Sequence, residues 1–129
     1  MSDYVKHKVL RIPWEKTNLP DYEDIGYEYQ KRYPELFGYA DIGKFQIAPT
    51  EKLFLDYVID YDYGYEGEYG KSRELYPCEK EHFLPVFRQI VPELKNMEDV
   101  RLVEYSWYNG TDAPNYYDPI EDPFNKPII

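Results

Sequence analysis

The sequence predicts an α+β fold, a small antiparallel sheet with two helices packed on one face and an extended C-terminal tail. Two observations support it. Two segments alternate apolar and polar residues with a period of two, which is typical of strands, and two others space their apolar residues by three and four, which is typical of helices. The order of segments (strand, helix, strand, strand, helix, hairpin) favours an antiparallel sheet with its helices on one face.

Three strands are predicted in the first half of the chain. Residues 4–12 alternate basic and apolar side chains, and residues 44–48 form a short second strand. Residues 53–63 carry the clearest pattern, with a period of two over eleven residues. This pattern is expected to put three aspartates on one face of the strand: Asp56, Asp60 and Asp62.

Two helices are predicted. Residues 20–33 begin with Pro20, which suits a first helical position, and acidic residues follow it at the positive end of the helix dipole. Residues 79–91 carry an apolar stripe that Pro85 interrupts, and a proline deep in a helix costs about 3 kcal/mol. This second helix is therefore expected to begin near Phe83 or to bend there.

The remaining segments are predicted from their turn residues. Residues 64–72 contain three glycines and no aliphatic residue, so we expect a surface loop. Residues 100–108 are expected to form a strand. The pair Asn109-Gly110 is a strong hairpin-turn signal, and a return strand is expected at residues 115–117.

The length of 129 residues fits one domain. We expect residues 1–117 to form a single α+β domain, followed by a proline-rich, acidic, extended tail at 118–129. Cys78 is the only cysteine and cannot form an internal disulfide. The first residues do not resemble a signal peptide, and no apolar run of about 18 residues is present. A cytoplasmic location is therefore expected.

Two features of the composition bear on function. The formal net charge is −10, which repels nucleic acids and anionic membranes and attracts basic surfaces. The chain contains 16 tyrosines against 6 phenylalanines and 2 tryptophans, although a core built for packing alone would favour phenylalanine. Tyrosine is enriched in protein interfaces, because it offers a large contact area with few torsions to restrict.

Sites for metal binding or catalysis are weakly supported. A calcium loop starting at Asp60 fails, because the fifth position is Gly64 and the sixth is Tyr65. Cys78 and His82 are four residues apart, but no second ligand pair for zinc and no oxyanion-hole signature accompany them. We expect no metal, no cofactor and no enzymatic activity. A small enzyme that uses Cys78 and His82, or a carboxylate pair, stays as an alternative.

The acidic residues are concentrated in two regions, 51–70 and 98–125, with net charges of −5 and −6. Carboxylates on one face of a strand are about 6.6–6.8 Å apart, comparable to two steps along a DNA strand, so they can imitate phosphates. Neighbouring tyrosines can stack on arginine. The partner-binding residues predicted on this basis are Asp56, Asp60, Asp62, Tyr63, Tyr65, Glu66, Glu68, Tyr69, Tyr108, Asp112, Tyr116, Tyr117 and Asp118.

The expected function is that of an acidic, tyrosine-rich inhibitor, which binds a basic nucleic-acid-handling protein by phosphate mimicry. Small acidic phage proteins that act against host defence, anti-CRISPR proteins among them, have the same general character, but no family motif is present here. An immunity protein that neutralises a cognate nuclease toxin is the alternative. Both hypotheses imply a basic protein partner, a nuclease or another nucleic-acid-binding effector, and no direct contact with nucleic acid or membrane.

Overall fold

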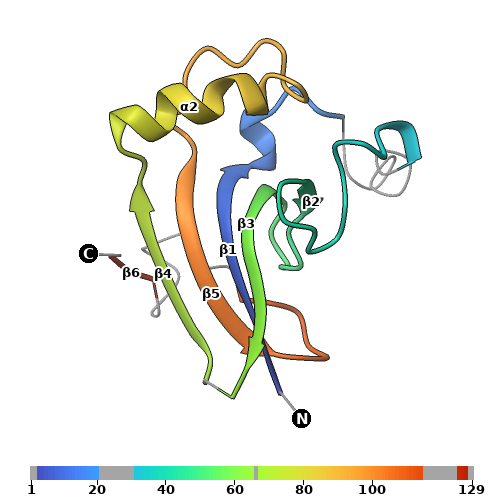
Figure 1. The fold of residues 1–129 in the computed structure, drawn as a ribbon, viewed down its shortest axis with the longest axis vertical. Coiled ribbons are helices and arrows are strands. Elements are labelled where there is room, and N and C mark those ends of the chain that lie inside the picture. The colour runs from blue at the N-terminus through green and yellow to red at the C-terminus, as the bar shows by residue number, and fades with distance from the viewer. Residues whose placement is uncertain (1–2, 21–30, 66, 115–124, 128–129) are drawn as a thin grey trace.

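The computed structural model describes residues 3–20, 31–65, 67–114 and 125–127. Six strands form one sheet in the order β2-β3-β1-β5-β4-β6 (Figure 1). Neighbouring strands are antiparallel, except that β4 and β6 are parallel. The strands are β1 (Tyr4–Pro13), β2 (Phe45–Ile47), β3 (Phe54–Gly64), β4 (Tyr69–Glu74), β5 (Arg101–Tyr108) and β6 (Asn125–Pro127).

The predicted α+β class and antiparallel sheet are confirmed. Strands β1, β2, β3 and β5 occupy the four segments in which alternation or turn signals predicted them. The described residues contain the α-helix α2 (Pro77–Phe87) and the 3₁₀ turn η1 (Trp14–Lys16), and residues 31–32 are also helical. The other predicted helix, at 20–33, falls mostly on residues 21–30, which lie outside the described part of the chain.

Apolar side chains cover both faces of the sheet. One face, called here the helix face, packs against α2 and the turns that follow it, which lie across the end of the sheet where β4 ends and β5 begins (Figure 1). Its core includes Leu10, Ile12, Leu55, Leu102 and Phe87. The other face, called the opposite face, carries a second cluster, formed by Val5, Val9, Val58, Val103, Tyr105, Trp107 and Ala113. The central strands therefore contribute side chains to both cores.

A β-bulge in β3 changes which residues share a face. Lys8 is opposite Asp60 and Val9 is opposite Val58, so Ile59 has no partner in β1. A bulge residue shifts the alternation of a strand by one position. The prediction that three aspartates share one face is therefore wrong. Asp56 lies on the opposite face and is buried, whereas Asp60 and Asp62 are exposed on the helix face.

The predicted surface loop at 64–72 is also partly wrong, because its second half forms β4. The strand has no aliphatic residue until Leu75, which hid it in the sequence. Its small residues have a structural use: Gly70 lies directly opposite Tyr105 in β5, and Ser72 lies opposite Val103. Both small residues are buried, so β4 contributes backbone pairing and leaves room for the large ring beside it.

Helix α2 begins earlier than predicted. Pro77 occupies the first turn, where its missing N–H costs nothing, and the Glu79 carboxylate accepts a hydrogen bond of 2.8 Å from the backbone N–H of Tyr76. Glu79 is held in place by Arg73, with a distance of 2.6 Å between Nη1 and Oε1. Pro85 lies inside the helix, which ends at Phe87. Of the two predicted possibilities, a helix that begins near Phe83 is wrong, and a bend there stays a prediction.

The end of β5 confirms the turn predicted at Asn109-Gly110, where Gly110 has a φ of 105° that favours glycine. The chain then reaches the connection between β2 and β3, where the Ala113 N–H donates to Pro49 O at 2.6 Å. The return strand predicted at 115–117 lies outside the described residues. Within the predicted tail, residues 125–127 form β6 beside β4.

A buried ion pair joins β1 to β3 at the centre of the sheet. Arg11 Nε and Nη2 donate to the two carboxylate oxygens of Asp56 at 2.8 and 2.9 Å, and both side chains are fully buried. The guanidinium also lies 4.7 Å from the ring centres of Phe54 and Tyr105. Burial favours the neutral form of Arg11, but the carboxylate outweighs it and raises the pKa of Arg11. Arg11 therefore keeps its positive charge.

We expect Arg11→Met or Asp56→Leu alone to lower the free energy of unfolding by about 3–5 kcal/mol, because each leaves a buried charge without its partner. The double variant should cost less than the sum of the two, since no charge is left unpaired. Urea denaturation of all three variants measures this. Lys80→Met is the control, because Lys80 pairs with the exposed Glu98 at 2.9 Å and its loss should cost less than about 1 kcal/mol. Additive losses in the double variant would contradict the coupling.

Candidate partner-binding surface

Three segments that are distant in sequence meet at one end of the sheet. Tyr4 lies between Gly64 of β3 and Tyr108 of β5 in the strand register. The rings of Tyr4 and Tyr108 are in edge contact, with 6.0 Å between their centres, and the Asn109 N–H donates to Asp3 O at 2.9 Å. The start of β1, the β3–β4 connection and the turn after β5 therefore form one surface (Figure 1).

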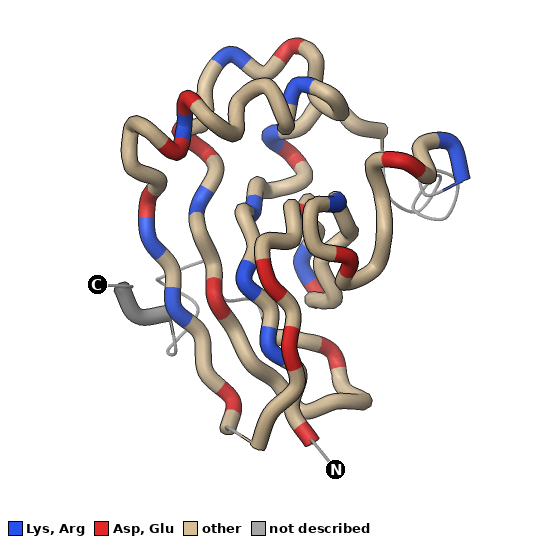
Figure 2. Tube along the Cα trace, viewed as in Figure 1, with Lys and Arg blue, Asp and Glu red and all other residues tan. Residues whose placement is uncertain are grey.

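This surface, called here the acidic end, is rich in acids and exposed tyrosines. Tyr63, Tyr65 and Tyr108 expose 50%, 72% and 53% of their area. The exposed acids of these three segments are Asp3, Asp62, Glu68 and Asp112. In the described part of these segments (3–6, 61–65, 67–69 and 106–114), Lys6 is the one cation. Figure 2 shows the acids gathered around the N-terminus and the β3–β4 connection.

The acidic end contains part of the predicted partner-binding set. The predicted residues that lie in the acidic end are Asp62, Tyr63, Tyr65, Glu68, Tyr69, Tyr108 and Asp112. Tyr69 is half-buried, and its hydroxyl lies 3.4 Å from Glu104 Oε1. Asp56 is fully buried against Arg11, so it has no surface to offer. Four other members lie outside the described residues: Glu66, Tyr116, Tyr117 and Asp118.

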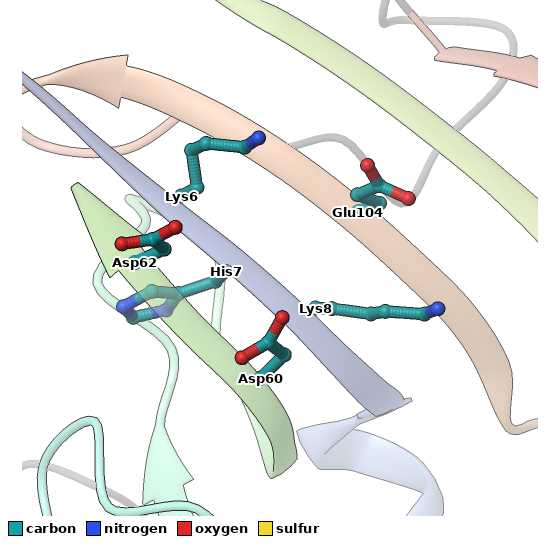
Figure 3. Close-up of a pocket in the computed structure, with 6 residues that line it drawn as sticks. All are labelled: Lys6, His7, Lys8, Asp60, Asp62 and Glu104. Carbon is teal, nitrogen blue, oxygen red and sulfur yellow. The ribbon is translucent and has the colours of Figure 1, made fainter. Parts of the chain in front are cut away.

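The two exposed aspartates of β3 have lysines beside them. Asp60 lies opposite Lys8 of β1, and Asp62 lies opposite Lys6. Figure 3 shows both lysines extending from β1 towards β5, where Glu104 stands. These residues line a shallow pocket of about 170 Å³ on the helix face, below the part that α2 covers. Its two ammonium groups and three carboxylates nearly cancel, so this patch imitates a run of phosphates poorly.

A polar cluster that the sequence analysis missed lies behind the tyrosines. His7 is buried on the opposite face, with its ring centre 4.8 Å from those of both Tyr61 and Trp107. The Tyr61 hydroxyl donates to the Tyr63 hydroxyl at 2.6 Å. Burial first, and then this hydrogen bond, raise the pKa of Tyr61, so Tyr61 is neutral at pH 7. His7 thus supports the tyrosine pair from below, and its alternation with Val5 and Val9 in the sequence was a signal of burial.

The hydrogen bonds of His7 define its tautomer. The Gln46 amide oxygen accepts the Ala40 N–H at 2.7 Å, so its NH₂ group faces His7 Nδ1 at 3.2 Å and donates to it. Nδ1 is therefore an acceptor, and the proton is on Nε2, which is buried and has no hydrogen-bond partner among the described residues. Burial first, and the nearby Arg11 charge second, lower the pKa of His7 from 6.5 to about 3. His7 is neutral at physiological pH.

The residues considered for catalysis are not joined in the structure. Cys78 and His82 are both exposed on α2, and no hydrogen bond connects them within the described residues. The described residues also contain no group of three or more His, Cys, Asp or Glu side chains placed to hold a metal ion. In the same part of the chain, no helix is long and apolar enough to cross a membrane.

Comparisons of the chain with protein-family models, with curated proteins and with solved structures found no match.

The low pKa of His7 predicts a loss of stability in acid. Below pH 6.5 the unfolded chain binds a proton at His7 that the folded chain does not bind until about pH 3, so the free energy of unfolding falls as the pH falls. The limiting slope of this contribution is about 1.4 kcal/mol per pH unit. We expect His7→Asn, whose amide oxygen can accept from Gln46, to be less stable than the wild type at pH 7 but less sensitive to pH between 6.5 and 4.5. Denaturation at several pH values tests this, and identical pH profiles would contradict it.

Proposed function

We propose that this protein is an inhibitor, which binds a basic nucleic-acid-handling protein and covers its nucleic-acid site with the acidic end of the sheet. The observation that carries the proposal is the meeting of Asp3, Glu68 and Asp112 with exposed tyrosines on one surface. A basic cleft that binds phosphates attracts such a surface over a long range, which speeds association.

The tyrosines give this surface a second means of binding. Tyr65 and Tyr108 expose more than half of their area. Such rings can cover apolar surface that lies between the cations of a basic partner, and they can stack on arginine. A surface with charge alone would be easily displaced by salt. A surface with charge and aromatic anchors can combine fast association with slow dissociation.

The proposed interface is centred on the acidic end and not on β3, whose aspartates the sequence pattern favoured. The carboxylates of Asp60 and Asp62 lie beside Lys8 and Lys6, which reduce the field they present. The turns at the acidic end carry acids with few cations near them. An immunity protein would use the same surface against a cognate nuclease toxin. The genes next to that of this protein separate the two versions, because a toxin gene supports immunity and phage genes support action against host defence.

We expect removal of charge at the acidic end to weaken binding. The test variant carries Asp3→Asn, Glu68→Gln and Asp112→Asn. The control carries Glu15→Gln, Glu35→Gln and Glu81→Gln, exposed acids elsewhere that give the same change in net charge. Each tagged protein is used to capture partners from host lysate at about 0.1 M salt, where charges interact over about 10 Å.

The wild type and the control should retain a basic nucleic-acid-binding protein that the test variant loses, and added DNA should compete for it. Equal retention by the test variant and the control would show that this surface is not the interface. Retention that DNA does not affect would contradict mimicry of nucleic acid.

The tyrosines are tested separately with the captured partner. Tyr65→Ser and Tyr108→Ser are each expected to raise Kd about fivefold or more, mostly through faster dissociation, because each removes an aromatic anchor. Tyr76→Ser is the matched control, since Tyr76 exposes 56% of its area but lies at the start of α2, far from the acidic end. Surface plasmon resonance measures both rates. An equal effect of all three changes would argue against a localised interface.

A further inference from the structure

One half of the outer edge of β3 is not paired with another strand in the described part of the chain. Strand β2 pairs with β3 only at residues 55–57, and the Val58 N–H then donates to Lys44 O at 2.9 Å. Beyond Val58, none of the described strands pairs with this side of β3, although β1 pairs with its other side as far as Gly64. Figure 1 shows this lower half of β3 extending past β2.

Two backbone N–H groups show how this edge is satisfied. The Tyr61 N–H donates to Asp60 Oδ1 at 2.9 Å, and the Tyr63 N–H donates to Asp62 Oδ1 at 2.8 Å. Each carboxylate thus takes the place that a carbonyl of a neighbouring strand would occupy. Both aspartates are exposed, so they can turn away at little cost when a carbonyl replaces them. The edge is protected, but it is still able to accept a strand.

The side chains along this edge define what it can accept. Because of the bulge, Asp60 and Asp62 lie on the helix face, and Tyr61 and Tyr63 lie on the opposite face. Strand β1, which pairs with the inner edge, matches this division. It places Lys8 and Lys6 opposite the two aspartates, and His7 and Val5 opposite the two tyrosines. The inner edge therefore shows which pattern complements β3.

We propose that the free edge of β3, residues 59–64, accepts a β-strand from the basic partner, in which lysine or arginine alternates with apolar residues. This inference rests on the proposed function for the source of the strand, and it adds the mode of binding. On addition, carbonyl groups of the incoming strand accept the N–H groups of Tyr61 and Tyr63. The released carboxylates pair with the cations of the new strand, and its apolar side chains pack beside the tyrosine rings.

The other end of the sheet order is less suited to this role. The outer edge of β4 is already paired with β6 over residues 70–72. Residues 59–64 of β3, by contrast, combine three features. Their outer edge is unpaired by the described strands, two of their N–H groups are bonded to aspartates, and the aspartates and tyrosines lie on different faces. This segment overlaps the acidic end at residues 61–64, so a partner drawn there by charge meets the open edge.

A peptide experiment separates strand addition from simple attraction between charges. The probe is a fluorescent eight-residue peptide that alternates lysine with valine, mixed with the full chain at about 0.1 M salt. Two further peptides carry N-methyl groups, on the lysines in one and on the valines in the other. Alternate N–H groups of a strand point to opposite sides, so only one of the two sets faces β3.

We expect the parent peptide to bind and to slow amide hydrogen exchange at Tyr61 and Tyr63. One N-methylated peptide should bind about tenfold more weakly than the other, because it loses hydrogen bonds to the edge. Equal binding of the two N-methylated peptides would overturn the proposal, since charge alone does not distinguish them. Failure of the parent peptide to bind would also overturn it.

A pair of variants tests the same edge in the partner complex. Tyr63→Ala and Tyr63→Pro both remove the phenol, but only the proline removes the N–H that faces the edge. Proline is tolerated on an outer edge, and circular dichroism checks the fold. We expect Tyr63→Pro to bind the captured partner at least about tenfold more weakly than Tyr63→Ala.

Equal affinities of these two variants, with binding still lost when the acidic end is neutralised, would reject strand addition and leave the proposed function standing. If the partner is retained by the neutralised acidic end, the proposed function fails instead. In that case, the difference in binding between the two N-methylated peptides still tests whether the edge of β3 accepts a strand.

Discussion

The ion pair between Arg11 and Asp56 determines the register of the central strands. Both side chains are fully buried, so a slip of β3 by one residue would leave two charges without partners in the core. This register holds above the bulge at Ile59, and the bulge then reverses the faces below it. As a result, the upper half of β3 contributes to the core, and its lower half presents aspartates on one face and tyrosines on the other.

The distribution of charge follows from this arrangement. Lysines of β1 lie beside the aspartates of β3, so the flat part of the sheet is close to neutral despite a net charge of −10 for the whole chain. In the described residues of the acidic end, four exposed acids stand against one cation, Lys6. A charged surface at the end of a sheet projects beyond the core and can enter a cleft, whereas a mixed patch in the middle of a sheet cannot. The tyrosines at this end are supported from the core, because His7 packs beneath Tyr61 and Trp107 packs against His7.

Periodicity was a good guide to the positions of β1 and β3, whose segments alternate in the sequence. It failed at Ile59, because a bulge leaves no mark in a sequence whose polar and apolar residues continue to alternate, and it therefore assigned Asp56 to the surface. It also missed β4, in which Gly70 and Ser72 pair with β5 without apolar side chains of their own. The acidic end was only partly predictable. Its residues were named from composition, but the contact of Asp3 and Tyr4 with the turn after β5 depends on pairing between opposite ends of the chain.

The central position of β1 has a consequence for folding while the chain is synthesised on the ribosome. It precedes the other described strands in the chain, yet its two neighbours are β3 and β5, and residues 14–100 separate it from the second of these. The nascent chain therefore carries a ten-residue strand with an unpaired edge until β5 has been synthesised. Sheets closed by such distant pairings form slowly, in milliseconds to seconds. In that interval Lys6 and Lys8 interrupt the apolar run and oppose its aggregation, so the same charges that neutralise the folded sheet also protect the unfinished one.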